Sequence, residues 1–325
     1  MLKIFKEIRK RILAIRWFYN MCHTQRFNFL FDDSLWPDWK GDPKEIFSPD
    51  KLCELLKNSD SESRKVVMNF IEKVTLDMNL RSMNFTLSYP EYSDKNAEEY
   101  AEYQKNEKIE SIANGIPALL EESFFFHHGM RNLPDSVKKY VCNKIFIDGG
   151  ACFGDSSLMF LKYHPEKVIA FDISPINAEI FCQVMKKNNM LDDKVFLILK
   201  GLGDKNGSFQ FMDGFSGGTS LNLAGDCEAE TVTLDSCKEV DGTVGWIKID
   251  LEGYGLPAVK GMVETIKRDR PVLTLAVYHC ADELFGIKKL LESLDLNYKI
   301  MFRSCRFDGY HELTLIAYPA ELDQV

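Results

Sequence analysis

Glycines and an acid follow directly after an apolar segment in the second half of the chain. The segment KIFID ends at Asp148 and runs into the loop GGACFG. Gly149, Gly150 and Gly154 allow the backbone to turn tightly and leave no Cβ in the way of a ligand. Ligands of open α/β sheets sit beyond the carboxyl ends of the strands. If KIFID is a strand, this loop is therefore a candidate ligand site.

A second carboxylate, Asp172, ends the next apolar segment, KVIAFD, 24 residues after Asp148. A carboxylate at this place can accept both hydroxyls of an adenosine ribose, in NAD and in S-adenosylmethionine alike. Asp172 therefore predicts a nucleoside ligand without selecting a reaction. A compatible interpretation is a helix N-cap ahead of Pro175. The dinucleotide fingerprint GxGxxG has glycine where this chain has Ala151, which disfavours a nicotinamide cofactor.

Further acids follow the later apolar segments. Asp204, in the loop GLGD, either meets an adenine edge or belongs to a hairpin turn. Asp250 and Glu252 follow the segment GWIKI, and a charge buried at a ligand edge needs a partner. The candidate partners are a cofactor ammonium, a metal ion and a substrate hydroxyl. An alternative for Glu252 is that it favours the next helix through the helix dipole.

His279 ends the segment PVLTLAVYH, at the same expected edge as Asp250. A neutral imidazole is suited to accept a hydroxyl proton because its pKa lies near working pH, so we predict His279 to be the catalytic base, with Asp250 and Glu252 as the other catalytic residues. The alternative is a histidine that caps the strand end or hydrogen-bonds the substrate. Asp250 and Glu252 offer oxygen ligands that suit Mg²⁺. The sequence places no third ligand beside them, so we predict no metal.

The segments that carry these residues alternate with helical patterns from position 144 onward. The alternation predicts right-handed βαβ units and a Rossmann-like, mainly parallel α/β sheet. The last two segments, YKIMFR and ELTLIAY, are joined by a short polar loop and should pair antiparallel. The expected parallel strands are 144–148, 167–172, 194–199, 245–250 and 271–279.

Residues 1–110 show helical patterns and loops and carry no recognisable chemistry. Within them, the stretch 47–78 opens with Ser48-Pro49-Asp50, which is a helix-start signal. The polar stretch 91–110 is either a solvated helix or a linker. We therefore predict a helical accessory region at 1–110 and a Rossmann-like domain at 111–325.

Composition limits the partners and the compartment. The net charge is −9, whereas a nucleic-acid binder normally presents a basic face, so we expect no nucleic acid. The nine cysteines form no CxxC pair, which argues against a zinc site and for a reducing, cytoplasmic compartment. Residues 1–20 carry six basic residues against one acid, with isoleucines at helical spacing. They predict either a helix docked on its own domain or one lying on the inner membrane surface.

The motifs FIDGGACFGDSS, KVIAFDISPINAEIFCQVMKKNN, LKGLGDKNG, GGTS, VTLDS and WIKIDLEGYGLPAVKG follow one another in this order. Together with the closing stretch AVYHCADEL…YKIMFRS…HELTLIAYP, they resemble the FkbM family of methyltransferases over about residues 140–319. The resemblance implies a class I methyltransferase sheet and S-adenosyl-L-methionine as the methyl donor. It also implies an acceptor that is commonly a hydroxyl of a sugar or glycan precursor.

The resemblance also implies roles by position. Asp148, Gly150 and Gly154 would line the methionine part of the donor, Asp172 would hold its ribose, and Asp250 would sit at the reaction edge. With Gly149 and Asp204, these residues make up the cofactor site that we predict. This chain departs from the family at Gly255, where an acid is often found.

We therefore expect an O-methyltransferase that acts on a saccharide. Its donor carries a reactive sulfonium, so the protein has mainly to align hydroxyl and methyl group and to remove a proton. One alternative is a cofactor-binding protein of the same fold without turnover, for which Gly255 leaves room. The other is an NAD-dependent oxidoreductase, disfavoured by Ala151 and by the antiparallel strand pair. The fold does not set the acceptor.

Overall fold

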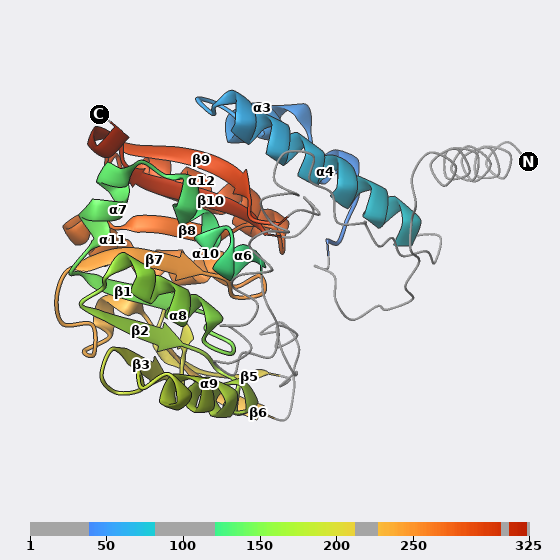
Figure 1. The fold of residues 1–325 in the computed structure, drawn as a ribbon. Coiled ribbons are helices and arrows are strands. Elements are labelled where there is room, and N and C mark those ends of the chain that lie inside the picture. Colours follow the sequence, from blue (N-terminus) through green and yellow to red (C-terminus); the bar gives the residue numbers. More distant parts are fainter. Residues whose placement is uncertain (1–38, 82–120, 212–226, 307–311, 324–325) are drawn as a thin grey trace, which may run out of the picture.

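A seven-stranded sheet forms the centre of the computed structural model, which describes residues 39–81, 121–211, 227–306 and 312–323 (Figure 1). The strands are β1 (Ile145–Gly149), β2 (Lys167–Phe171), β3 (Val195–Ile198), β7 (Val244–Ile249), β8 (Val272–Ala276), β9 (Tyr298–Ser304) and β10 (Leu313–Pro319). Their order is β3-β2-β1-β7-β8-β10-β9. The first five in this order run parallel, and β10 is antiparallel to both β8 and β9.

This arrangement confirms the predicted fold class, a mainly parallel sheet with an antiparallel C-terminal hairpin. Each of the five predicted parallel segments overlaps a parallel strand, and no strand extends more than one residue beyond its segment. A second, small sheet was not predicted. Its strands are β4 (Gly201–Leu202), β5 (Gly207–Phe211) and β6 (Cys227–Val232), in the order β4-β6-β5. The GGTS motif at 217–220 lies outside the described residues.

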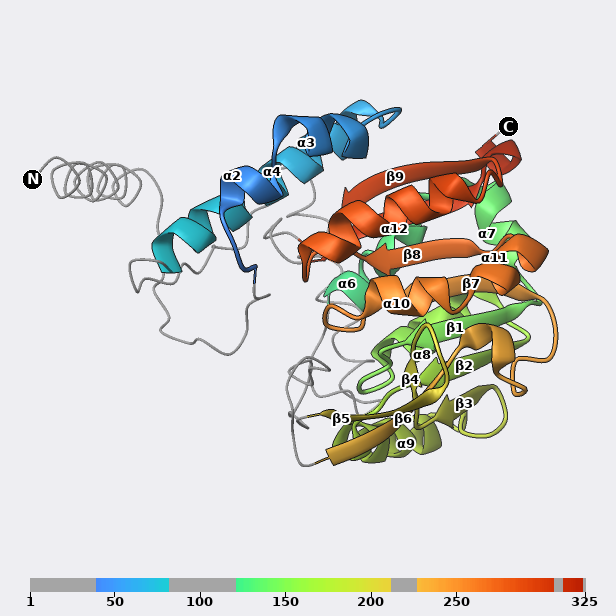
Figure 2. The same ribbon diagram turned by 180° about the vertical axis from the view of Figure 1, so that it is seen from behind.

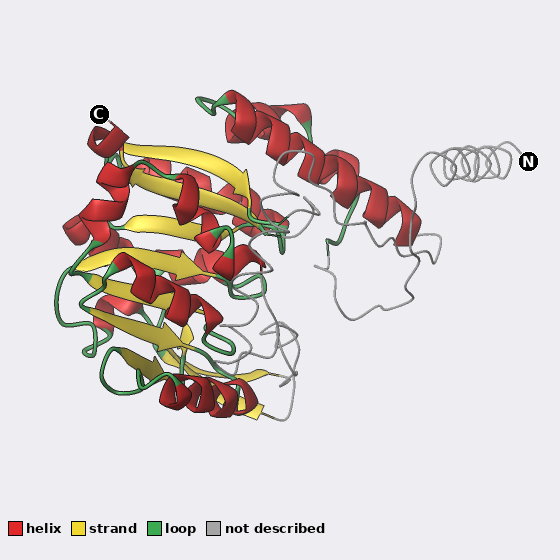
Figure 3. Ribbon diagram, in the orientation of Figure 1, coloured by secondary structure: helices red, strands yellow, loops and turns green. Residues whose placement is uncertain are grey.

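Helices cover both faces of the large sheet, as Figure 3 shows by colour. One face carries α7 (Asp135–Val141), α8 (Asp155–Phe160) and α9 (Pro175–Lys187). The opposite face, seen in Figure 2, carries α10 (Gly255–Lys260), α11 (Val263–Asp269) and α12 (Ala281–Ser293). Because both faces are covered, the central strands are apolar on both sides. In β1, Ile145 and Ile147 join one core and Phe146 joins the other.

Short helical segments complete the described fold. They are α6 (Glu121–Phe124) and the 3₁₀ turns His127–Asn132, Leu161–Tyr163, Leu234–Ser236 and Ala320–Asp323. Among the residues that the structure describes, no helix is long and apolar enough to cross a bilayer. The basic segment 1–20 and the polar stretch 91–110 lie outside this part of the chain.

Three helices precede the sheet: α2 (Pro43–Ile46), α3 (Pro49–Leu55) and α4 (Ser61–Arg81). Helix α3 begins at the predicted Ser48-Pro49 signal, with Ser48 as N-cap residue. Helix α4 lies along the edge strand β9 (Figures 1 and 2). An edge strand presents unpaired backbone groups, and a covering helix hides them from other chains.

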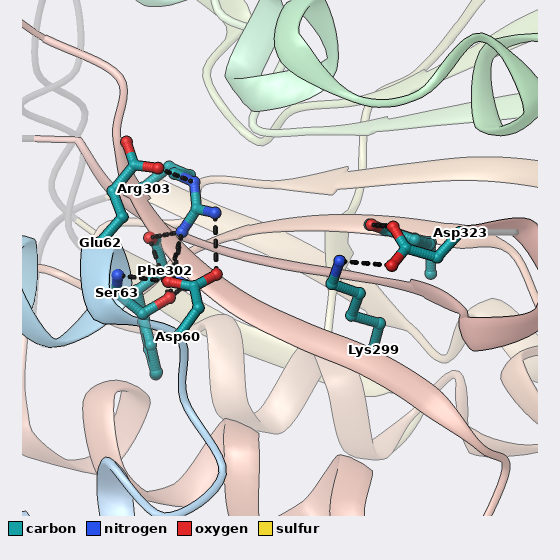
Figure 4. Close-up of polar contacts among 8 residues, drawn as sticks. Asp60, Glu62, Ser63, Lys299, Phe302, Arg303 and Asp323 are labelled. Carbon is teal, nitrogen blue, oxygen red and sulfur yellow. Dashed lines mark hydrogen bonds and ion pairs between the residues drawn. The ribbon is translucent and has the colours of Figure 1, made fainter. Parts of the chain in front are cut away.

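Side chains of α4 and the residues just before it satisfy polar groups of β9 (Figure 4). The backbone N–H of Phe302 donates to Ser63 Oγ at 2.9 Å. Arg303 donates to both carboxylate oxygens of Asp60, at 2.9 and 3.3 Å, and lies 3.3 Å from Glu62. Helix α4 is therefore held on the sheet edge by specific hydrogen bonds. Further along β9, Lys299 pairs with Asp323 of the C-terminal 3₁₀ turn at 2.7 Å.

Apolar side chains of the N-terminal helices join the core of the sheet. Trp39, Phe70 and Val74 are buried in the cluster that contains Leu275 of β8 and Phe302 of β9. The described part of the predicted accessory region thus shares one core with the sheet. The expected boundary at residue 110 lies outside the described residues and stays a prediction.

Candidate functional site

A cavity of about 270 Å³ lies at the carboxyl ends of β1, β2 and β7. Gly150, Asp172 and Asp250, which follow these three strands, all line it. Parallel strands present their carboxyl ends at one sheet edge, so the topology brings these loops together. Six carboxylates line the cavity, from Glu122, Asp155, Asp172, Asp250, Glu252 and Glu312. Two lysines accompany them, Lys200 and Lys248, and the cavity is strongly acidic.

The turn after β1 depends on two glycines with positive φ. Gly150 has φ +75°, and a Cβ there would lie 1.8 Å from the carbonyl oxygen of Asp250. The loops after β1 and β7 therefore pack backbone to backbone. Gly154 has φ +86°, and its Cβ would lie 2.4 Å from Met185 on α9. Of the three predicted glycines, only Gly150 lines the cavity; Gly149 ends β1, and Gly154 lies in the turn behind the cavity.

Asp172 ties the loops after β1 and β2 together. Its carboxylate accepts hydrogen bonds from the backbone N–H of Cys152 and of Ser174, both at 2.8 Å. Helix α9 is capped by Ser174, whose Oγ accepts from Asn177 N, so Asp172 is not itself the N-cap. Burial raises the pKa of Asp172. Each carboxylate oxygen has a second lone pair for a ribose hydroxyl.

Asp148 lies below the cavity and does not line it. Its side chain is fully buried, accepts a hydrogen bond from Ser157 at 2.7 Å, and pairs with Lys248 Nζ at 3.2 Å. Lys248 in turn donates to the Gly150 carbonyl at 2.8 Å. Although burial disfavours its charge, Asp148 and Asp250 raise the pKa of Lys248. Asp148 thus supports the loop after β1 through Lys248. The sequence analysis did not single out Lys248, although this lysine interrupts an otherwise apolar strand.

Asp250, Glu252 and His279 converge where β7 and β8 end. The Nε2 atom of His279 lies 3.3 Å from Asp250 Oδ1 and 3.5 Å from Glu252 Oε2. The His279 side chain is 5% exposed, that of Asp250 21% and that of Glu252 39%. Both carboxylates line the cavity, and the imidazole lies behind them. The structure therefore brings together all three residues that we predicted as catalytic.

The second ring nitrogen of His279 is held by Glu283, one helical turn later. His279 Nδ1 lies 3.0 Å from Glu283 Oε2. Burial alone would lower the pKa of His279, but Glu283 and the two cavity carboxylates raise it to about 10. Our prediction assumed a base with a pKa near neutrality, whereas these neighbours favour the protonated imidazole. A catalytic role for His279 stays a prediction.

Glu283 also occupies the space beside Gly255. The Gly255 N–H donates to Glu283 Oε1 at 2.8 Å, and a Cβ on Gly255 would lie 2.7 Å from the same oxygen. A carboxylate from α12 therefore fills the place into which a side chain at position 255 would point. The spacing of His279 and Glu283, four residues apart, was the available sequence signal for this pair.

A polar network on another wall of the cavity was also missed. Ser123 Oγ donates to the Asp155 carboxylate and lies 3.2 Å from His128 Nε2. The same imidazole nitrogen lies 2.8 Å from Ser156 Oγ. Burial raises the pKa of Asp155. Asp155 and Ser156 lie at the start of α8, within the motif FIDGGACFGDSS, whereas Ser123 of α6 and His128 of the turn after it lie in no motif.

Glu312 and Tyr278 line the cavity as well. The Tyr278 hydroxyl donates to Glu312 Oε1 at 2.9 Å, and burial raises the pKa of Glu312 well above its ordinary value. Asp204, in contrast, is exposed and does not line the cavity. The residues of this segment that line it are Lys200, Gly201 and Leu202. The structure gives no support for contact between Asp204 and a ligand in the cavity.

The sequence and the fold were compared with known proteins. Residues 148–305 match the family model described as the methyltransferase FkbM domain. The search of curated proteins found no match.

Solved structures give three similarities of fold. The FkbM methyltransferase from Methylobacillus flagellatus KT is 17% identical with a TM-score of 0.48, covering 81% of this chain and 63% of that one. An rRNA methylase from Streptococcus thermophilus is 14% identical with a TM-score of 0.41, covering 62% and 98%. A candidate methyltransferase from Streptococcus mutans in complex with SAH is 17% identical with a TM-score of 0.37, covering 56% and 92%. The chain thus spans less than two thirds of the length of the FkbM structure.

Proposed function

We propose that this protein is an S-adenosylmethionine-dependent O-methyltransferase that modifies a hydroxyl of a sugar or glycan precursor. The observation that carries the proposal is the acidic cavity at the carboxyl edge of the parallel strands, with Asp172 at the end of β2. The methyltransferase FkbM domain at 148–305 supports the reaction class.

The residues of the cavity fit this donor chemically. Asp172 retains free lone pairs for the two ribose hydroxyls, because each oxygen uses one for a backbone N–H. The donor carries positive charge on its sulfonium and ammonium groups, and carboxylates around a partly buried cavity favour a cation. Gly150 brings the loop backbone to the cavity wall without a side chain.

The bound donor supplies an electrophilic methyl group on sulfur. As the acceptor oxygen bonds to that methyl carbon, the carbon–sulfur bond breaks and the hydroxyl proton has to leave. Asp250 and Glu252 line the cavity and are placed to hold the hydroxyl and receive the proton. His279, kept in place by Glu283, orients both carboxylates from behind.

The acceptor class rests on the FkbM resemblance and on the acceptor chemistry of the cavity. Carboxylates accept hydrogen bonds and suit a ligand rich in hydroxyl donors, as a saccharide is.

In isothermal titration calorimetry of the full chain we expect S-adenosylhomocysteine to bind and NAD not to bind. Binding of NAD without S-adenosylhomocysteine would contradict the donor assignment. Binding without turnover on any saccharide acceptor would favour a protein that holds the cofactor only.

A further inference from the structure

We propose that Asp250, Glu252 and His279 form a binding site for one divalent cation of the Mn²⁺ type. One carboxylate oxygen of each acid and the Nε2 atom of His279 all lie within 4.8 Å of one another. The two acids follow β7 and the histidine follows β8, its parallel neighbour, so the sheet itself holds the three side chains together. The prediction of no metal rested on a missing third ligand, and His279 supplies it.

The separations suit a shared ion. Ligands at about 2.1 Å from a metal and at right angles to each other lie about 3 Å apart. His279 Nε2 is 3.3 Å from Asp250 Oδ1 and 3.5 Å from Glu252 Oε2. Small side-chain rotations would close these separations, and the backbone need not move.

Unsatisfied atoms point to what this site binds. His279 Nε2 and Asp250 Oδ1 are both buried and lack a hydrogen-bond partner within the described residues. Their contact at 3.3 Å is not aligned as a hydrogen bond, whereas a cation between them would satisfy both atoms. The side chain that carries Nε2 is 95% buried, as its exposure of 5% implies, and it faces the two carboxylates. An acidic cluster alone would not show this feature.

The surroundings of His279 are those of a metal ligand. Its Nδ1 contacts the buried carboxylate of Glu283, and this contact orients the ring so that Nε2 faces the carboxylates of Asp250 and Glu252. Glu283 is itself held by the Gly255 N–H. Glu252 has φ +49°, an uncommon conformation for a residue other than glycine, and it turns this acid back toward His279.

The ligand set selects the kind of ion. Two carboxylates and one imidazole combine oxygen and nitrogen donors, which suit Mn²⁺ better than the all-oxygen preference of Mg²⁺ or Ca²⁺. Three protein ligands leave positions of an octahedral ion on the cavity side, which Asp250 and Glu252 line. Acceptor oxygens could fill those positions only if the proposed function is right. Binding of the ion itself does not depend on the proposed function.

The test uses Mn²⁺ alone with the full chain, without donor or acceptor, and counts free Mn²⁺ by electron paramagnetic resonance. We expect one bound ion per chain and at least about tenfold weaker binding in Asp250→Asn and Glu252→Gln. Asp172→Asn is the matched control, because it removes a carboxylate charge from the same cavity at another strand. It should bind Mn²⁺ as the unmodified chain does.

A spectroscopic arm tests His279 without a substitution in the core. Electron spin-echo modulation of bound Mn²⁺ should show coupling to an imidazole nitrogen, which changes when the protein is labelled with ¹⁵N-histidine. The proposal is overturned if no Mn²⁺ binds below millimolar concentration or if no nitrogen coupling appears. It is also overturned if Asp172→Asn weakens binding as much as Glu252→Gln, since that result means diffuse attraction to an acidic cavity. None of these results bears on methyl transfer itself.

Discussion

Removal of the Lys248 ammonium should destabilise the fold and loosen the loop after β1. The side chains of Lys248 and Asp148 are only 4% and 0% exposed, and their charged atoms are 3.2 Å apart. In Lys248→Met, Asp148 keeps its hydrogen bond from Ser157 but becomes a buried charge without a cation. Loss of one partner of a buried pair costs about 3–5 kcal/mol. The Gly150 carbonyl also loses the donor that it has in the native chain.

The double variant Asp148→Asn/Lys248→Met is the matched control. Asparagine is neutral and can still accept from Ser157, so the buried charge disappears together with its partner. We expect urea unfolding to give the double variant a free energy of unfolding above that of Lys248→Met, although below that of the native chain. The reasoning is refuted if Lys248→Met loses less than about 1 kcal/mol, or if the double variant is no more stable than the single one.

Three further outcomes follow from the structure. Asp172→Ala should lose about 1.5–3 kcal/mol of S-adenosylhomocysteine binding, hence at least tenfold in affinity by calorimetry, whereas Asp204→Ala should lose nothing; equal affinity in both variants would contradict the ribose assignment. Phe70→Ala should lose about 3–5 kcal/mol in urea unfolding, because this side chain is 2% exposed in the shared core. Met68→Ala on the same helix, where the side chain is 46% exposed, should stay near the native value; equal effects would mean that α4 is not part of the core. Burial, with Lys162 next, lowers the pKa of His127 from 6.5 to about 4, so the unfolded chain binds more protons in this window and stability rises with pH. His127→Asn should lose that contribution when unfolding is measured from pH 4 to pH 7, and an unchanged slope would contradict it.

The sequence predicted the sheet well because parallel strands covered on both faces must be apolar throughout. KIFID, KVIAFD and GWIKID each contain a strand close to the predicted bounds. The antiparallel end was predicted from the short loop between two apolar segments. The docking of α4 was beyond sequence reasoning, because Ser63 and Phe302 are 239 positions apart. The helical stretch from residue 47 divides into α3 and α4 around Asn58, which has φ +59°.

The site was predictable where residues follow strand ends. Asp172, Asp250 and His279 converge because parallel strands bring their carboxyl ends to one edge. Asp148 and Asp204 also follow strand ends, but neither lines the cavity: Asp148 is buried and pairs with Lys248, and Asp204 is exposed. Their contact with a ligand stays a prediction. The pKa of His279 depends on Glu283 and on both cavity acids, so its protonation needed the tertiary structure. Glu122 and Glu312 reach the cavity from outside the strand-end loops of the parallel sheet. Glu122 lies in no motif, and Glu312, although it lies in the stretch HELTLIAYP, precedes an antiparallel strand.

The most direct test of the central claim is transfer of a methyl group from S-adenosylmethionine. The full chain is incubated with the donor and with candidate sugar nucleotides and polysaccharides, and the products are measured by mass spectrometry. We predict an acceptor heavier by one CH₂ group, formed together with S-adenosylhomocysteine and absent without the protein. If S-adenosylmethionine stays intact with every acceptor of this class while the chain is folded and binds the donor, the claim of a glycan methyltransferase is contradicted.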